Sequence, residues 1–220
     1  MGSEKGTKQR IIDGAVDCFN QHGYGKTSLQ DISRHLGISR GNLTYHFPSK
    51  EELLKVTFQQ MWQGFTAEQD KARALPSFQN LKNELEVYLH YQKSYSFIFM
   101  DSQVMSIPFI HRALQEMSQR TIEDNQAAIA FGLEVGNMKP EPFPGAYRQL
   151  AITTWMLMCF WLPQQAIRGT EEDPEKAVWS LILPHFSEKG VNAFKKHYGE
   201  AFYESLGPPF DQDLKDFVVL

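Results

Sequence analysis

The chain has 220 residues, of which 42% are hydrophobic and 13% are aromatic, and it carries a formal net charge of -4. A chain of this length and composition buries a substantial core and forms one or two domains. The negative charge excludes a protein that coats nucleic acid with its whole surface, but it is compatible with a local basic patch.

Helical spacing of apolar residues dominates the sequence, and the alternation typical of strands is lacking, so we expect an all-α protein. The first helix is expected over residues 7–22. Thr27 is expected to cap a second, short helix that stops at Gly37, and Ser39 is expected to cap a third helix that Pro48 ends.

Longer helices are expected in the rest of the chain. Ser49, with Glu52 three residues later, forms a capping-box pattern that opens a fourth helix to about residue 73. Asp173 before Pro174 is another start signal. The further helices are expected over residues 76–101, 108–135, 145–168, 174–186 and 190–206.

Charge divides the chain into two parts. Seven basic and three acidic side chains lie between residues 5 and 50, whereas the whole chain has 22 basic and 26 acidic side chains. This asymmetry predicts that only the N-terminal part meets a polyanion. We expect a basic N-terminal domain over residues 1–48, a larger helical domain over residues 49–206, and a tail over residues 207–220.

The second and third expected helices have the pattern of a helix-turn-helix. Their turn contains Gly37, which readily adopts a positive φ, and Leu43 and Phe47 are spaced to face the second helix. The polar side chains left on the opposite face are Arg40, Asn42, Thr44 and His46. Because arginine pairs with guanine and asparagine with adenine, this face is expected to read base edges.

With these features, residues 8–54 closely resemble the TetR family of transcriptional regulators. The most particular part is the Tyr-His-Phe-x-x-Lys run at residues 45–50, which leads directly into a long helix. Thr44 is a departure, because the family very often has tyrosine there. The other matching positions are Phe19, Gly23, Thr27, Ser28, Asp31, Ile32, Leu36, Gly37, Ile38, Ser39, Gly41, Leu43, Glu51, Glu52 and Leu53.

The resemblance implies a homodimer of all-α subunits, each with a three-helix helix-turn-helix DNA-binding domain over residues 1–48 and a larger helical regulatory and dimerisation domain over residues 49–206. The dimer binds double-stranded DNA at a palindromic operator, and the larger domain binds a small-molecule effector. The resemblance also implies phosphate contacts at Thr27, Tyr45, His46 and Lys50, whose chemistry suits phosphate oxygens. Tyr45 could instead pack on the fourth helix, and Lys50 could be a solvated charge. The expected DNA-binding residues are Thr27, Ser28, Ser39, Arg40, Asn42, Thr44, Tyr45, His46 and Lys50.

Methionine and aromatic side chains are frequent in the larger domain. Flexible methionines and flat rings suit a pocket for an apolar or aromatic compound, although ordinary core is the alternative for each of them. Asp101 is either a solvent-facing residue at a helix end or a polar handle for the ligand. The expected ligand-binding residues are Met61, Trp62, Phe65, Phe97, Met100, Asp101, Met105, Met117, Trp155 and Met158.

Near the C-terminus, apolar residues recur at helical spacing, and they serve either a dimer interface or the core of their own subunit. The members of this C-terminal stripe are Trp179, Leu183, Phe186, Phe194, Tyr198 and Phe202.

The longest apolar run, residues 150–162, is shorter than the roughly 20 residues that span a bilayer, and the N-terminus lacks an apolar signal segment, so we expect a cytoplasmic protein. Cys18 and Cys159, far apart in apolar surroundings, are expected to be reduced core residues.

These patterns predict a ligand-responsive, sequence-specific transcriptional regulator, a repressor released from its operator by a small apolar or aromatic molecule. Catalytic motifs such as HExxH, CxxC and GxSxG are lacking, so we expect no enzyme, cofactor or metal. Glu86 and His90, four residues apart, would be two metal ligands without a third. The alternative function is an all-α small-molecule carrier or sensor without specific DNA binding, and a DNA-binding assay would discriminate the two.

Overall fold

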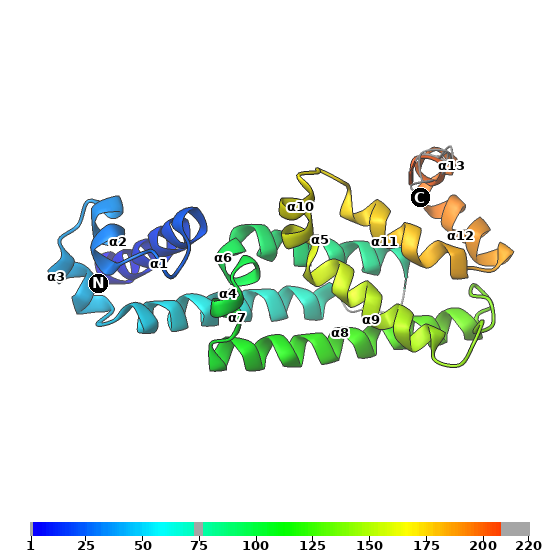
Figure 1. The fold of residues 1–220 in the computed structure, drawn as a ribbon, viewed down its shortest axis with the longest axis horizontal. Coiled ribbons are helices and arrows are strands. Elements are labelled where there is room, and N and C mark those ends of the chain that lie inside the picture. Colours follow the sequence, from blue (N-terminus) through cyan, green and yellow to red (C-terminus); the bar gives the residue numbers. More distant parts are fainter. Residues whose placement is uncertain (1, 73–76, 208–220) are drawn as a thin grey trace, which may run out of the picture.

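The computed structural model describes residues 2–72 and 77–207, and every regular element within them is a helix, as predicted. The molecule is elongated, with α1 (Gly2–His22), α2 (Leu29–Leu36) and α3 (Arg40–His46) gathered at one end (Figure 1). The other helices form a body that extends away from this end. The expected tail beyond residue 207 lies outside the described residues.

The turn between α2 and α3 forms as the sequence predicts. Gly37 has a φ of 64° and ends α2, and Ser39 caps α3 by accepting a hydrogen bond from the amide of Asn42 at 3.1 Å. The predicted cap of α2 is wrong by one residue, because Ser28 accepts from the amide of Asp31 and Thr27 is buried. The hydroxyl of Thr27 instead donates to the carbonyl of Gly23 at 2.8 Å, which fixes the loop that follows α1.

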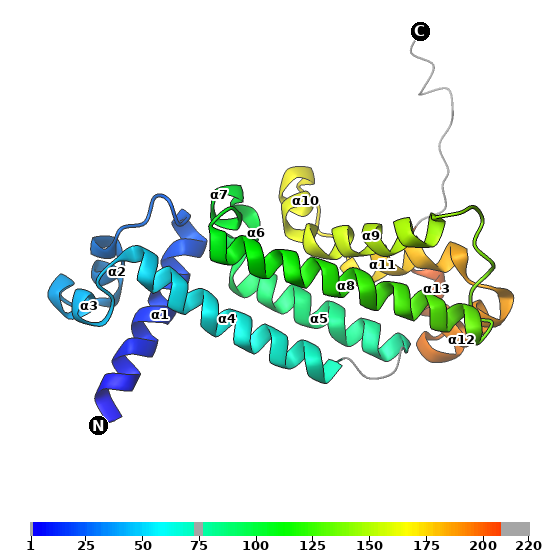
Figure 2. The same cartoon turned by 90° about the horizontal axis from the view of Figure 1, so that it is seen from below.

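One helix connects the two parts of the molecule. α4 (Lys50–Ala72) starts after Ser49, whose hydroxyl accepts from the amide of Glu52 at 3.1 Å, and it runs out of the three-helix end into the body. There it lies beside α5 (Phe78–Ser94), which runs in the opposite direction. α8 (Pro108–Glu134) runs in the same direction as α4 (Figure 2). The predicted end of α4 and start of α5, at residues 73 and 76, lie outside the described residues.

The predicted single helix over residues 76–101 is wrong, because α5 ends at Ser94 and is followed by α6 (Ser96–Met100) and α7 (Ser102–Met105). The side chain of Asn20 in α1 explains the first break. Its amide donates to the carbonyl of Ser94 at 2.8 Å, and its oxygen accepts from the amide of Phe97 at 3.1 Å. These tertiary bonds replace the helical bonds that the two backbone groups would otherwise make.

The predicted helix over residues 145–168 is also divided, into α9 (Ala146–Cys159) and α10 (Trp161–Arg168). Pro163 accounts for the break, because it lacks an amide hydrogen and its ring would clash with the carbonyl of Cys159 in a continuous helix.

The two C-terminal helices are shorter than predicted. α11 (Pro174–Ile182) gives way to a 3-10 turn that contains Pro184. α12 (Glu188–Tyr198) begins at the cap Ser187, and Gly199, with a φ of 90°, separates it from α13 (Glu200–Glu204).

Two clusters of buried side chains hold the chain together. The inner core joins the three-helix end to the near half of the body, and its members include Phe19, Phe47, Phe58, Phe97 and Ile110. The outer core lies at the far end and comprises Met138, Tyr147, Leu150, Trp179, Leu183, Phe186 and Phe194, with Tyr198 and Phe202 packed against it. The C-terminal stripe is therefore part of the core of its own subunit. The domain boundary at residue 48 stays a prediction, since the inner core crosses it.

Candidate nucleic-acid interface and body cavity

The outward face of α3 is a continuous polar surface. Ser39, Arg40 and Asn42 are exposed, and Tyr45 is 75% exposed. On the opposite face Leu43 is fully buried, as the spacing predicts. The three-helix end therefore presents a short helix whose side chains can enter a groove of a duplex.

Thr44 and His46, two other residues predicted to contact DNA, are half-buried. The hydroxyl of Thr44 donates to the carbonyl of Arg40 at 3.0 Å within α3, so this hydroxyl is engaged inside its own helix. His46 is half-buried, with its ring centroid 5.1 Å from that of Tyr45. The high exposure of Tyr45 favours the predicted contact with DNA over packing on α4, and the phosphate contact stays a prediction.

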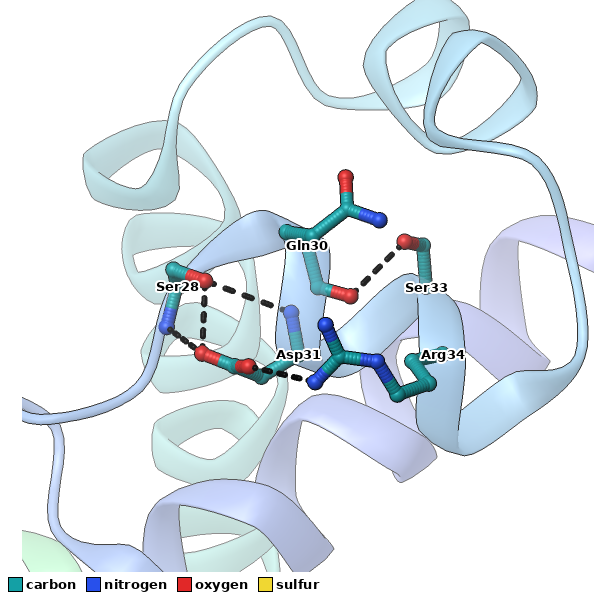
Figure 3. A network of polar contacts seen from close by, with 5 residues as sticks. All are labelled: Ser28, Gln30, Asp31, Ser33 and Arg34. Atoms are coloured by element: carbon teal, nitrogen blue, oxygen red, sulfur yellow. Dashed lines mark hydrogen bonds and ion pairs between the residues drawn. The ribbon is translucent and has the colours of Figure 1, made fainter.

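Ser28 begins a polar network on α2 (Figure 3). Its hydroxyl donates to the carboxylate of Asp31 at 2.6 Å, and its amide donates to the same carboxylate oxygen at 3.0 Å. These two bonds, reinforced by Arg34 at 3.1 Å, hold the pKa of Asp31 below its usual range. The network fixes the start of α2, while Ser28 itself remains exposed.

Thr27 and Lys50 are occupied within the chain. The hydroxyl of Thr27 points into the protein, as described above, and its side chain is 2% exposed. The ammonium of Lys50 donates to the carbonyl of Tyr24 at 2.9 Å and lies 4.3 Å from the centroid of the Tyr24 ring. Lys50 is thus a cross-link between the start of α4 and the loop after α1, not a solvated charge. Phosphate contacts at both positions stay predictions.

The ten predicted ligand-binding residues do not surround one cavity. Met61, Phe65, Phe97, Met117 and Met158 are buried in the inner core, and Trp62 and Trp155 pack against it. Met100 is 47% exposed, and Met105 is half-buried. Asp101 accepts from the amide of Gln103 at 2.9 Å and caps α7, as the helix-end alternative predicts.

Three of the ten line a cleft of about 800 Å³ between the three-helix end and the body. These are Phe97, Met100 and Asp101, and Phe19 and Asn20 of α1 line the same cleft. The rings of Phe97 and Phe19 are in contact, with centroids 5.2 Å apart. This part of the predicted site therefore belongs to the junction between the two parts of the molecule.

A second, mainly apolar cavity of about 590 Å³ lies in the outer half of the body, between α5, α8, α9 and α11. Its lining includes no residue of the predicted ligand set. The sequence did contain a signal for this cavity, because the acidic Glu84 lies among the apolar positions Leu81, Leu85 and Tyr88 on one face of α5. The aromatic lining residues are Phe78, Phe131, Trp179, Phe186 and His197.

Two carboxyl groups line this outer cavity. Burial, and next the charge of Asp124, raise the pKa of Glu84 to about 7. The pKa of Asp124 is also raised by burial, against the opposing effect of the Arg120 guanidinium. A buried hydrogen bond of 2.6 Å joins the hydroxyls of Tyr88 on α5 and Thr121 on α8, about one helical turn from each carboxyl group.

The cysteines lie in the core, away from the polar face of α3 and from the lining of the outer cavity. Cys18 and Cys159 are both buried and free, as predicted. Burial raises the pKa of Cys159 to about 11, which leaves its thiol protonated and unreactive at neutral pH. No group of three potential metal-ligating side chains occurs in the part of the chain that the structure describes.

The three-helix end and the helical body together define a helix-turn-helix protein with a larger all-α domain. Residues 11–57 match the family described as bacterial regulatory proteins, tetR family, and residues 57–194 match bacterial transcriptional repressor, TetR. The second match covers more than half of the chain. The chain belongs to the TetR family.

Individual relatives agree with this assignment. The HTH-type transcriptional regulator RutR of Escherichia coli is 28% identical over 138 residues, which are 60% of this chain and 65% of that protein. The HTH-type transcriptional regulator CymR of Pseudomonas putida is 30% identical over 129 residues, 56% of this chain and 61% of its own. The matches thus span less than two thirds of these relatives.

A solved structure shares the fold over nearly the whole length. The crystal structure of a TetR-family transcriptional regulator from Marinobacter aquaeolei superposes with a TM-score of 0.74, covering 92% of this chain and 99% of that chain at 20% sequence identity. No helix among the described residues has the length and apolar character needed to cross a membrane.

Proposed function

We propose that this protein is a sequence-specific transcriptional regulator that represses by binding a palindromic operator as a homodimer in the cytoplasm, without catalysis. The observation that carries the proposal is the exposed polar face of α3, with Arg40 and Asn42 free to meet base edges. A dimer is needed because one short helix reads only a few base pairs, and a two-fold axis matches palindromic half-sites.

The proposed effector is a small molecule that binds in the outer cavity. α5 carries the signal, since its first half lines the cavity and its last residue, Ser94, accepts the hydrogen bond from Asn20 of α1. A helix of this length spans about 25 Å, so a small displacement at the cavity reaches the three-helix end. A tenfold weakening of operator binding requires about 1.4 kcal/mol of coupling between the two sites.

The function is tested by selecting the purified chain against a pool of random duplexes and sequencing the retained DNA. An enriched palindrome is expected. Retention without a common motif would favour the carrier or sensor without specific DNA binding, which remains the alternative because the cavity alone would serve that function equally well.

Arg40→Ala is expected to weaken binding to the selected operator by about 1–3 kcal/mol and to relax the preference for one base pair, because a bidentate contact to guanine is lost. The measurement is the affinity for the operator and for each single-base variant of it. Arg148→Ala is the matched control, since Arg148 is an exposed arginine of α9, outside the three-helix end. Equal loss on every duplex for Arg40→Ala would make Arg40 a phosphate contact.

Asn20→Ala is expected to lower the free energy of unfolding by about 1–3 kcal/mol, because the carbonyl of Ser94 and the amide of Phe97 lose their partner. The amide of Phe97 should also exchange its hydrogen faster. Urea unfolding and hydrogen exchange measure the two effects. Asn192→Ala, at an exposed position of α12, is the control. Unchanged exchange at Phe97 would mean that this junction does not persist in solution.

A further inference from the structure

The outer cavity combines a wall of aromatic rings with carboxyl groups on one side. Phe78 stacks on Phe186, with ring centroids 6.0 Å apart, and meets Trp179 edge to face at 5.6 Å. Phe78 comes from α5, and Trp179 and Phe186 come from α11 and the turn after it, so two segments far apart in sequence line the same space. Such a wall accepts the apolar body of a ligand, and its ring faces attract a positive charge.

The geometry of α5 and α8 brings the two carboxyl groups to the same side of this cavity. Tyr88 and Thr121 are hydrogen-bonded across the two helices. Glu84 lies four residues before Tyr88, and Asp124 lies three residues after Thr121, so in this antiparallel pair both are one turn further out in the same direction. Each one lines the cavity.

Among the residues that line the cavity His197 is the one basic side chain, and the guanidinium of Arg120 acts on Asp124 from outside the lining. Lys82, the nearest lysine of α5 in sequence, is engaged with Glu175 at 3.4 Å. The side-chain oxygen of Asn137, which also lines the cavity, is buried and accepts no hydrogen bond. A ligand with a positive charge and N–H or polarised C–H donors would complement these acceptors.

We propose that the outer cavity binds an organic cation, a small ammonium compound with an apolar or aromatic body. Its charged nitrogen lies beside Glu84 and Asp124, and its apolar part lies against Phe78, Trp179 and Phe186. This inference rests on the proposed function in that it names the chemical class of the effector. A cavity of about 590 Å³ is in the size range of sites for such compounds.

The test compares two probes of the same shape, phenyltrimethylammonium and its uncharged isostere tert-butylbenzene. Calorimetric titration of the full chain without DNA gives both affinities. The cation is expected to bind at least about tenfold more tightly than the isostere. Glu84→Gln and Asp124→Asn should each lower the affinity for the cation about tenfold and leave the affinity for the isostere unchanged. Glu116→Gln, at an exposed glutamate of α8, is the matched control and should change neither.

Equal binding of both probes, binding of neither probe, or cation binding that survives in Glu84→Gln and Asp124→Asn would overturn the inference. Circular dichroism of each variant excludes loss of folding as the cause of weaker binding. The proposed function is tested separately, by adding phenyltrimethylammonium to the complex with the selected operator. Cation binding without any change in operator affinity would contradict the proposed ligand response but would still support the cation site.

Discussion

Phe47→Ala is expected to lower the free energy of unfolding by about 3–5 kcal/mol, because it removes a fully enclosed ring from the inner core. Phe47 is 1% exposed and ends α3, where its amide bonds to the carbonyl of Leu43. The loss would be a large part of the stability of a domain of this size. Urea unfolding followed by circular dichroism measures it.

Tyr45→Ala is the natural comparison, since Tyr45 lies two residues earlier and is 75% exposed. Its removal should change the free energy of unfolding by less than about 0.5 kcal/mol. If Tyr45 contacts phosphate, the same variant should weaken all duplexes alike. A small stability loss for Phe47→Ala would contradict the burial of this ring, and a large one for Tyr45→Ala would mean that its ring packs on the protein in solution.

The three-helix end could be predicted because local signals specify it. Gly37, Ser39 and the spacing of Leu43 and Phe47 act within a few residues of the structure that they produce. Thr27 shows the limit of such signals. Threonine and serine are both good caps, and only the bonds of Thr27 to the loop after α1 decide that Ser28 caps α2.

The body was predicted as helical, but its breaks and its cavity depend on contacts between distant segments. Asn20 interrupts a helix 74 residues further along the chain. The aromatic and methionine content predicted a pocket for an apolar or aromatic compound, yet composition does not distinguish a filled core from an open cavity. Met61 and Met158 therefore lie in packed core, whereas Glu84, an acid among apolar positions, lines the cavity.

The raised pKa of Glu84 predicts a pH-dependent contribution to stability. Its ordinary value of 4.5 rises to about 7 in the folded chain, so folding favours the protonated carboxyl group. A group with a raised folded pKa contributes stability that is present below its unfolded pKa and is lost as pH rises through the folded pKa. Asp124 of α8 acts on the carboxyl group of Glu84, and Glu84 in turn raises the pKa of Tyr88 on its own helix. His197 of α12 lines the same cavity.

Glu84→Gln should therefore be more stable than the unmodified chain at pH 8, by up to about 2–3 kcal/mol, and should match it near pH 4.5. Urea unfolding of both proteins at pH 4.5, 6 and 8 measures the difference, which should grow steadily across this window. Glu116→Gln should show no such trend, since Glu116 is exposed. A constant difference at all three pH values would mean that Glu84 has the same pKa in the folded and the unfolded chain, and the acidic side of the outer cavity would then be open to water.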